Sequence, residues 1–255
     1  MDPDLKNTLS GPDIRLHYLG HAAFLLHFDT GSSVLMDYGQ SCAYELDSPV
    51  YDIGSLQPTI VTYSHHHPDH DRGATFDTGY VLDGVDALTL GDITVEPVRT
   101  TERTREDNTS YRIAYKDFSI LHLGDAQGSM ARIDQEDMRE HLKAIFSEPI
   151  DLLLLPIGWT QDIAREAEAT VALLQPRRAI PMHYWNTQEK RRFLGHLEAQ
   201  NRTARATYQV KEIASAEYDV RVDETHVTPV QVISLEPAPL NAPLKGLESS
   251  LCQEV

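Results

Sequence analysis

The segment "SHHHPDHD" (64–71) carries four histidines and two aspartates within seven consecutive positions. Its ordered pattern is His65-x-His67-x-Asp69-His70, and an apolar, β-branched run that is typical of a strand directly precedes it. His65 and His67 can turn toward one ion, and Asp69 and His70 toward a second ion nearby. Neutral imidazole and carboxylate are ligands that zinc prefers, and they also suit iron or manganese. The pattern therefore predicts one or two divalent metal ions, with zinc favoured over manganese or iron.

A histidine-rich surface tract of the purification-tag type is the alternative interpretation. Such a tract has no aspartate in register and does not follow a strand, so the metal site is the better hypothesis. A metal site also needs ligands from elsewhere in the chain. Asp125 in "SILHLGDAQG" and His183 in "AIPMHYWN" each follow an apolar run. Each alone would more often be structural, but together with the cluster they become candidate ligands.

The elements that would position these residues are short strands in the first half and alternating strands and helices in the second. Residues 14–39 are predicted to form two strands joined by a turn at 29–31. Helices are predicted at 134–146, with Asp134 as N-cap, and at 162–175 and 187–200. Further strands are predicted at 58–64, 80–82, 87–90, 93–98, 110–114, 118–123, 150–158 and 178–184. This order indicates a layered α/β sandwich.

Composition restricts the partners. The 255 residues are 41% hydrophobic and 24% charged, with a formal net charge of −17. Such a charge repels phosphate backbones, which excludes nucleic acid and favours a small-molecule partner. No apolar run approaches the roughly 20 residues of a membrane span, and the first residues lack the pattern of a secretory signal. With two distant cysteines, the expected location is the cytoplasm.

Several motifs together resemble the metallo-β-lactamase superfamily. They are the histidine cluster, "HLGD" (122–125), "IPMHY" (180–184), "YLGHAAFLL" (18–26) and "VLMDYG" (34–39). Residues 151–184 resemble, more narrowly, the subgroup of L-ascorbate-6-phosphate lactonase-like proteins. The resemblance implies a four-layer αβ/βα sandwich over residues 14–235, with an N-terminal extension at 1–13 and a C-terminal tail at 236–255.

The resemblance also implies a role for each candidate ligand. His65 and His67 would hold one ion, and Asp69, His70 and His183 the other, with Asp125 bridging both. Asp37 would orient a ligand histidine through its second ring nitrogen. His21 would play a similar supporting part, and a core histidine satisfied by backbone is an equally good interpretation of it.

One expected ligand is missing. The family pattern places a further histidine on the first metal, but the segment 93–113 contains none. Three explanations stay open. In the first, Glu102 supplies an oxygen ligand in place of the histidine, which would favour a harder ion such as manganese or iron. Alternatively the first site is weak or empty, or the chain has lost catalysis. We favour a retained but altered site, because the other six ligand positions are filled.

The chemistry that fits is hydrolysis of a small-molecule ester, lactone or phosphoester. A metal ion lowers the pKa of bound water toward about 7, and Asp69 is placed to orient that water and move its proton. Arg99 and Arg103 are candidates for docking an anionic substrate, although exposed arginines are more often solvated. Trp159 and Tyr184 are candidate pocket walls, and structural packing is an equally good interpretation of Trp159. The alternatives are an iron-dependent redox or oxygen-handling protein, and a non-catalytic metal-binding protein with a degenerate first site. A homo-oligomer is compatible with each of these functions.

Overall fold

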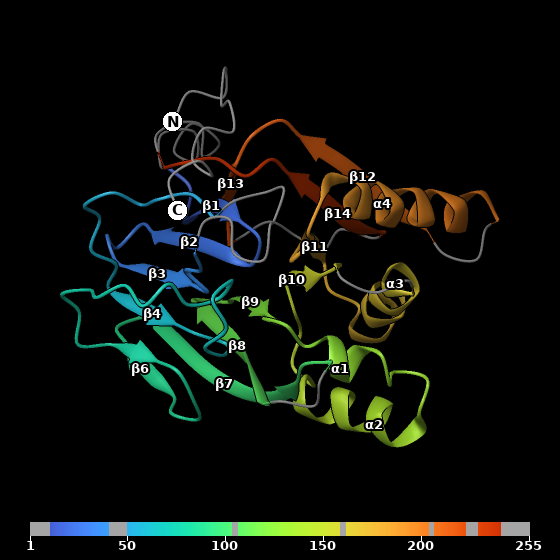
Figure 1. The fold of residues 1–255 in the computed structure, drawn as a ribbon, viewed down its shortest axis with the longest axis horizontal. Helices are drawn as coiled ribbons and strands as arrows, with labels where there is room; N and C mark the ends of the chain where they lie inside the picture. The colour runs from blue at the N-terminus through green and yellow to red at the C-terminus, as the bar shows by residue number, and fades with distance from the viewer. Residues whose placement is uncertain are drawn as a thin grey trace, which may run out of the picture.

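The computed structural model describes residues 11–40, 50–103, 107–158, 162–203, 207–222 and 229–240. Within these ranges two β-sheets lie against each other, and the helices pack beside the second sheet (Figure 1). The first sheet has the strand order β13-β1-β2-β3-β4-β5. Its strands are β1 (Ile14–Gly20), β2 (Ala23–Phe28), β3 (Ser33–Met36), β4 (Ile60–Thr62), β5 (Val81–Leu82) and β13 (Glu217–Val220).

The second sheet has the order β12-β14-β11-β10-β9-β8-β7-β6. The pairings from β6 to β9 are antiparallel, and those from β9 through β10, β11 and β14 to β12 are parallel. Its strands are β6 (Leu88–Leu90), β7 (Ile93–Thr101), β8 (Asp107–Tyr115), β9 (Phe118–His122), β10 (Leu152–Pro156), β11 (Arg178–Met182), β12 (Tyr208–Ile213) and β14 (Val230–Leu235). Strands β10 and β11 are buried along their whole length, as continuous apolar runs in a parallel sheet should be.

The described helices are α1 (Gln127–Met130), α2 (Glu136–Ile145), α3 (Ile163–Leu174) and α4 (Thr187–Arg202). The main core fills the space between the sheets and continues under α2, α3 and α4. A smaller cluster on the other face of the first sheet joins Leu25, Leu35 and Val61 to Val50 and Ile53 of the following loop. The arrangement confirms the predicted α/β sandwich.

Three local predictions differ from the structure. Residues 14–39 hold three strands rather than two, because β1 and β2 join in a tight turn in which Gly20 and His21 both have positive φ. Helix α2 begins after Gln135, so Asp134 is not its N-cap. Helix α1 and strands β12, β13 and β14 were not predicted; β12 and β13 expose many of their side chains, which weakens the apolar signal.

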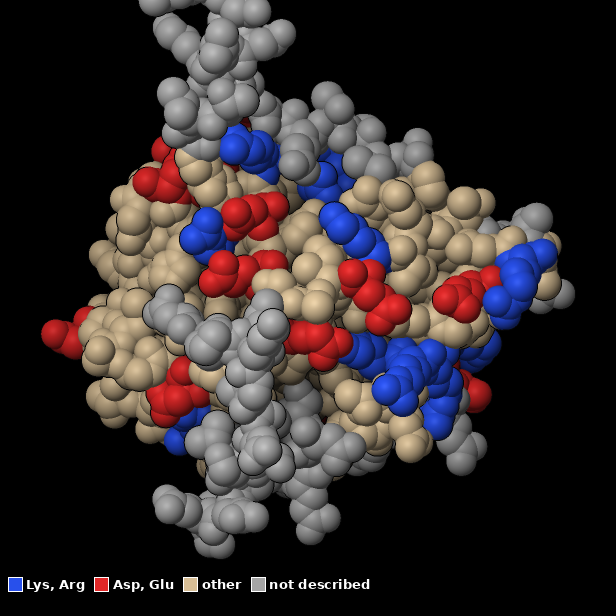
Figure 2. Space-filling model, turned by 90° about the horizontal axis from the view of Figure 1, so that it is seen from above, with Lys and Arg blue, Asp and Glu red and all other residues tan. Residues whose placement is uncertain are grey.

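None of the helices in the described ranges is long and apolar enough to cross a membrane. On the face shown in Figure 2, Lys and Arg side chains are interspersed with Asp and Glu, and the largest basic group gathers at one side. The chain's strong negative charge is thus not segregated into a separate acidic surface on this face.

Candidate metal centre

The predicted ligands come together where strands of both sheets end. His65 and its neighbours follow β4, Glu102 follows β7, Asp125 follows β9, and His183 follows β11. His21 lies in the turn between β1 and β2. The carboxyl ends of neighbouring parallel strands share one edge of a sheet, which is why residues so far apart in sequence meet here.

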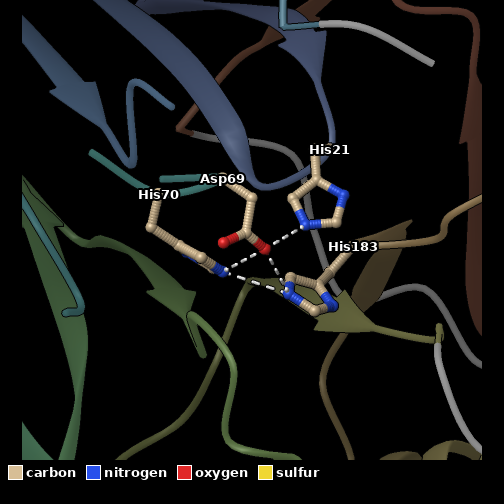
Figure 3. A group of neighbouring side chains, drawn as sticks. All are labelled: His21, Asp69, His70 and His183. Carbon is tan, nitrogen blue, oxygen red and sulfur yellow. Dashed lines mark hydrogen bonds and ion pairs between the residues drawn. The ribbon is translucent and has the colours of Figure 1, made fainter. Parts of the chain in front are cut away.

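One group of four donors is formed by His21, Asp69, His70 and His183 (Figure 3). Asp69 Oδ2 lies 3.0 Å from His21 Nε2, 3.5 Å from His70 Nε2 and 3.7 Å from His183 Nε2. His70 Nε2 and His183 Nε2 are 3.0 Å apart. Ligands about 2.0–2.1 Å from a tetrahedral zinc ion are roughly 3.3 Å from one another. The four atoms have the spacing of a metal-binding set.

A second group is formed by His65, His67 and Glu102. Glu102 Oε2 lies 3.6 Å from His65 Nε2 and 3.4 Å from His67 Nδ1. The Glu102 side chain is buried, whereas that of His67 is 43% exposed and gives this group access to solvent. The structure therefore places Glu102 where the prediction of a substitute oxygen ligand requires it.

Asp125 lies beside the first group, and Glu102 of the second group is near enough for its charge to act on Asp125. Its Oδ2 is 3.8 Å from His183 Nε2, and the residue is buried. Burial and the nearby carboxylates of Glu102 and Asp69 together outweigh the opposing charge of His70 and raise the pKa of Asp125 to about 7. Three carboxylates crowded in a buried space call for positive charge between them.

Asp37 and Ser64 fix the ring orientation of one histidine in each group. Asp37 Oδ2 accepts from His70 Nδ1 at 2.7 Å and from Ser64 Oγ at 2.7 Å. Ser64 Oγ in turn lies 3.0 Å from Nδ1 of His65 and can accept its proton. With both Nδ1 atoms protonated, the Nε2 lone pairs of His65 and His70 are left for a metal. Burial opposes ionisation of Asp37, yet the charges of His70 and His122 lower its pKa to about 2.

Backbone strain concentrates in the same place. Among the described residues, five other than glycine have positive φ, and three of them are His21, Asp37 and His183. Such conformations cost free energy for side chains with a Cβ and persist where the surrounding structure imposes them. At His183 the backbone N–H donates to the carbonyl of His21 at 2.8 Å, which ties the two ligand-bearing turns together.

The donor atoms fit metal ions. His65 Nε2, Asp69 Oδ1 and Asp125 Oδ1 are buried and have no hydrogen-bond partner among the described residues. Burial and the adjacent His70 together lower the pKa of His65 to about 3, so this imidazole is neutral at physiological pH and able to coordinate. Orphaned buried polar atoms are costly unless a ligand satisfies them. Two ions, together with the water they bind, would satisfy all three.

The structure places the other predicted residues as follows. Arg99 is exposed, and its guanidinium holds Asp107 at 2.6 Å on the rim of a cavity beside His65. Arg103 is exposed. Tyr184 is buried with its ring edge toward Tyr18, so it belongs to the core rather than to a pocket wall. Trp159 lies outside the described residues.

Sequence analysis missed two residues of the centre, Ser64 and Gln127. Gln127 is fully buried, and its amide nitrogen Nε2 lies 3.0 Å from Nδ1 of His183, while Oε1 has no hydrogen-bond partner among the described residues. Its only signal in the sequence is its position two residues after Asp125. His21, predicted as a supporting or core histidine, stands among the donors themselves and contacts Asp69 directly.

Comparison with known proteins gives a consistent result. The family model described as the beta-lactamase superfamily domain matches residues 15–183. A UPF0173 metal-dependent hydrolase of Pyrobaculum islandicum is 30% identical over 204 residues, which cover 67% of this chain and 84% of that protein. A UPF0173 metal-dependent hydrolase of Methanopyrus kandleri is 28% identical over 207 residues, covering 67% of this chain and 84% of that protein.

The fold has solved counterparts. The crystal structure of a metallo-beta-lactamase superfamily protein from Thermotoga maritima matches with a TM-score of 0.58 at 19% sequence identity. The match covers 87% of this chain and 98% of that chain. At this identity the likeness shows the shared fold.

Proposed function

This chain belongs to the beta-lactamase superfamily and is a metal-dependent hydrolase; from that premise we propose that it acts on a small-molecule ester, lactone or phosphoester. The observation that carries the proposal is the presence of two donor groups, with Asp125 beside His183 of one group and within electrostatic reach of Glu102 of the other. The resemblance of residues 151–184 to lactonase-like proteins supports the choice of substrate class.

Each donor group would hold one divalent ion. His65, His67 and Glu102 would bind the first. Asp69, His70 and His183 would bind the second, with His21 beside Asp69. Asp125 would contribute to both. The bound ions would supply a water of lowered pKa and would polarise the carbonyl or phosphoryl oxygen of the substrate.

Asp69 would then handle the proton. Its Oδ2 is engaged by His21 Nε2 at 3.0 Å, while its buried Oδ1 has no hydrogen-bond partner among the described residues. One oxygen therefore fixes the orientation of the carboxylate and the other is left to orient a water molecule and accept its proton. Burial opposes ionisation of Asp69, yet the charge of His70 and the hydrogen bond and charge of His21 lower its pKa, so that the carboxylate is ionised.

A cavity of about 670 Å³ beside His65 could take the substrate. This volume lies in the range of small-molecule sites. Its lining includes Ser64, His65, His66, Asp83, Arg99 and Asp107. The mixture of charges suits a compact polar molecule.

A second candidate function rests on Glu102. Two imidazoles and one carboxylate form the donor set of many non-haem iron(II) sites that handle oxygen. The group of His65, His67 and Glu102 has this composition. An iron-dependent redox protein on the same fold is therefore the alternative.

Two measurements together test the proposal. The first is the metal content per chain, determined by elemental mass spectrometry on protein purified without chelator or added metal. The second is a set of hydrolysis assays on esters, lactones and phosphodiesters. We expect two equivalents, a drop to one in Glu102→Ala, and hydrolysis that Asp69→Asn abolishes without loss of the fold. One equivalent in the unaltered protein would limit the centre to a single ion. Iron in both sites with no hydrolysis of any substrate would favour the alternative, and hydrolysis that survives Asp69→Asn would remove the proposed role of Asp69.

A further inference from the structure

Helix α1 begins two residues after Asp125 and contacts the chain at both donor groups. We propose that α1 is the element that positions the ligands of both groups: Gly128 and Ser129 set the place of Glu102, and Gln127 sets the ring of His183. This inference rests on the proposed metal centre and assigns the residues on which its geometry depends.

Gly128 allows a close approach that no other residue would permit. A Cβ at this position would lie 1.8 Å from the carbonyl oxygen of Glu102, 2.5 Å from its carbonyl carbon and 2.9 Å from the carbonyl oxygen of Thr101. These are backbone atoms, which cannot swing aside as the end of a flexible side chain can. The backbone of Glu102 therefore rests directly on α1 because residue 128 is glycine.

Ser129 fixes the residue before Glu102. Its Oγ accepts a hydrogen bond from the backbone N–H of Thr101 at 3.1 Å and lies 3.2 Å from Thr101 Oγ1. Ser129 is buried, so water does not compete for these contacts. The end of β7 is thereby held at two adjacent points, and the Glu102 carboxylate is directed toward His65 and His67.

Gln127 acts on the other group. Its side chain is fully buried, with amide Nε2 3.0 Å from His183 Nδ1 and Oε1 without a hydrogen-bond partner among the described residues. A half-turn of the amide exchanges these two atoms, so that Oε1 accepts the Nδ1 proton and the Nε2 lone pair of His183 is left for a metal. Three consecutive residues of α1 thus support ligands of both donor groups.

Other ligand-bearing segments rest on glycine in the same manner. A Cβ at Gly39 would lie 1.9 Å from the carbonyl oxygen of Asp69, and one at Gly158 would lie 2.1 Å from that of His183. The contact between Gly128 and Glu102 has the same form as the contacts under these predicted ligands. Glu102 is therefore positioned as they are, which is unexpected for a residue in a decayed site.

The test is a metal titration of chelator-treated protein with Co²⁺, followed by absorption spectroscopy, in Gly128→Ala, Ser129→Ala and Gln127→Ala. Gly195→Ala is the matched glycine control, because a Cβ there meets no atom within 4 Å. Ser234→Ala is the buried-serine control, since Ser234 is buried in β14. Circular dichroism and melting temperature report on folding independently.

We expect Gly128→Ala and Ser129→Ala to weaken binding of the ion that Glu102→Ala also loses, by about 10- to 100-fold for the serine variant. In a Glu102→Ala background, Ser129→Ala should have no further effect, because it acts through Glu102. Gln127→Ala should weaken the other ion and should do so in the Glu102→Ala background too. Both controls should bind as the unaltered protein does.

Unchanged Co²⁺ affinity in a folded Ser129→Ala variant would overturn the proposal that α1 positions Glu102. An equal further loss of affinity in the Glu102→Ala background would overturn it as well. If Gly128→Ala does not fold, Ser129→Ala alone provides the test. Unchanged affinity in Gln127→Ala would overturn the part that concerns His183. Failure of the proposed function is distinguishable, because it would appear as two bound ions and no hydrolysis in the unaltered protein.

Discussion

Asp37 Oδ2 and His70 Nδ1 lie 2.7 Å apart in the buried interior, and the same carboxylate accepts from both the backbone N–H and the hydroxyl of Ser64. One acidic side chain therefore controls the ring of His70 directly and that of His65 through Ser64. The two donor groups are linked by this carboxylate as well as by α1.

We expect Asp37→Asn to weaken the binding of both metal ions by about 10- to 100-fold each. Asparagine tolerates positive φ, so the substitution keeps the backbone and removes the charge. Metal titration measures the effect, and Asp151→Asn is the control, because Asp151 is also buried and also accepts a backbone N–H, from Ser119 at 2.8 Å. Loss confined to one ion would show that Ser64 does not pass the effect to His65.

Glu102→His should keep two ions per chain and shift the first site toward zinc. Imidazole replaces a hard oxygen donor with a nitrogen donor that zinc accepts readily and manganese binds less well. Competition between Zn²⁺ and Mn²⁺, followed by elemental analysis, measures the shift. Glu102→Gln, which keeps the shape but loses the charge, should lose the ion; equal metal preference in all three proteins would mean that residue 102 is not a ligand.

His21→Ala should weaken the ion bound at Asp69, His70 and His183 by at least about tenfold. The imidazole holds Asp69 Oδ2 at 3.0 Å, and alanine removes this contact. His17→Ala is the control, because His17 is a buried histidine whose Nε2 is 3.0 Å from the carbonyl of Ala238, outside the donor groups. If both variants bind metal equally well, His21 is an ordinary core histidine.

Removing the metal should lower the melting temperature. The carboxylates of Asp69, Asp125 and Glu102 are buried near one another, and without cations they repel. At a metal concentration about 100-fold above its dissociation constant, each ion that is removed costs about 2.7 kcal/mol of stabilisation, or roughly 5–10 °C per ion for a chain of this size. Differential scanning calorimetry with and without chelator tests this, and His70→Ala should respond less than the unaltered protein. An identical melting temperature in both conditions would argue against resident metal.

Arg99→Ala should raise KM for an anionic substrate, whereas Asp107→Ala should lower it. The Arg99 guanidinium is now held by Asp107 at 2.6 Å, and removing that carboxylate frees it to bind the substrate. Steady-state kinetics on one anionic and one neutral ester measures both effects, and the neutral ester is the control. The docking role is ruled out when neither variant changes KM for the anionic ester.

Much of this centre could be predicted from the sequence because its ligands sit in short motifs. The pattern of His65, His67, Asp69 and His70 needs only local spacing, and Asp125 and His183 were identifiable because each follows an apolar strand. The missing histidine was equally visible, and with it the candidacy of Glu102 as a substitute ligand. The strand order and the exact helix starts were less accessible, as the three strands within 14–39 show.

What only the tertiary structure decided is which atoms converge. His21 meets Asp69 across 48 positions of sequence, and Gln127 meets His183 across 56. Neither pair has a sequence signal, because contacts between turns of different strands depend on sheet register and on how closely two backbones approach. Gly128 shows the physical reason most plainly. Because residue 128 has no Cβ, α1 can pack directly against the backbone of Glu102. No local pattern in the sequence indicates which backbone segment a glycine will contact.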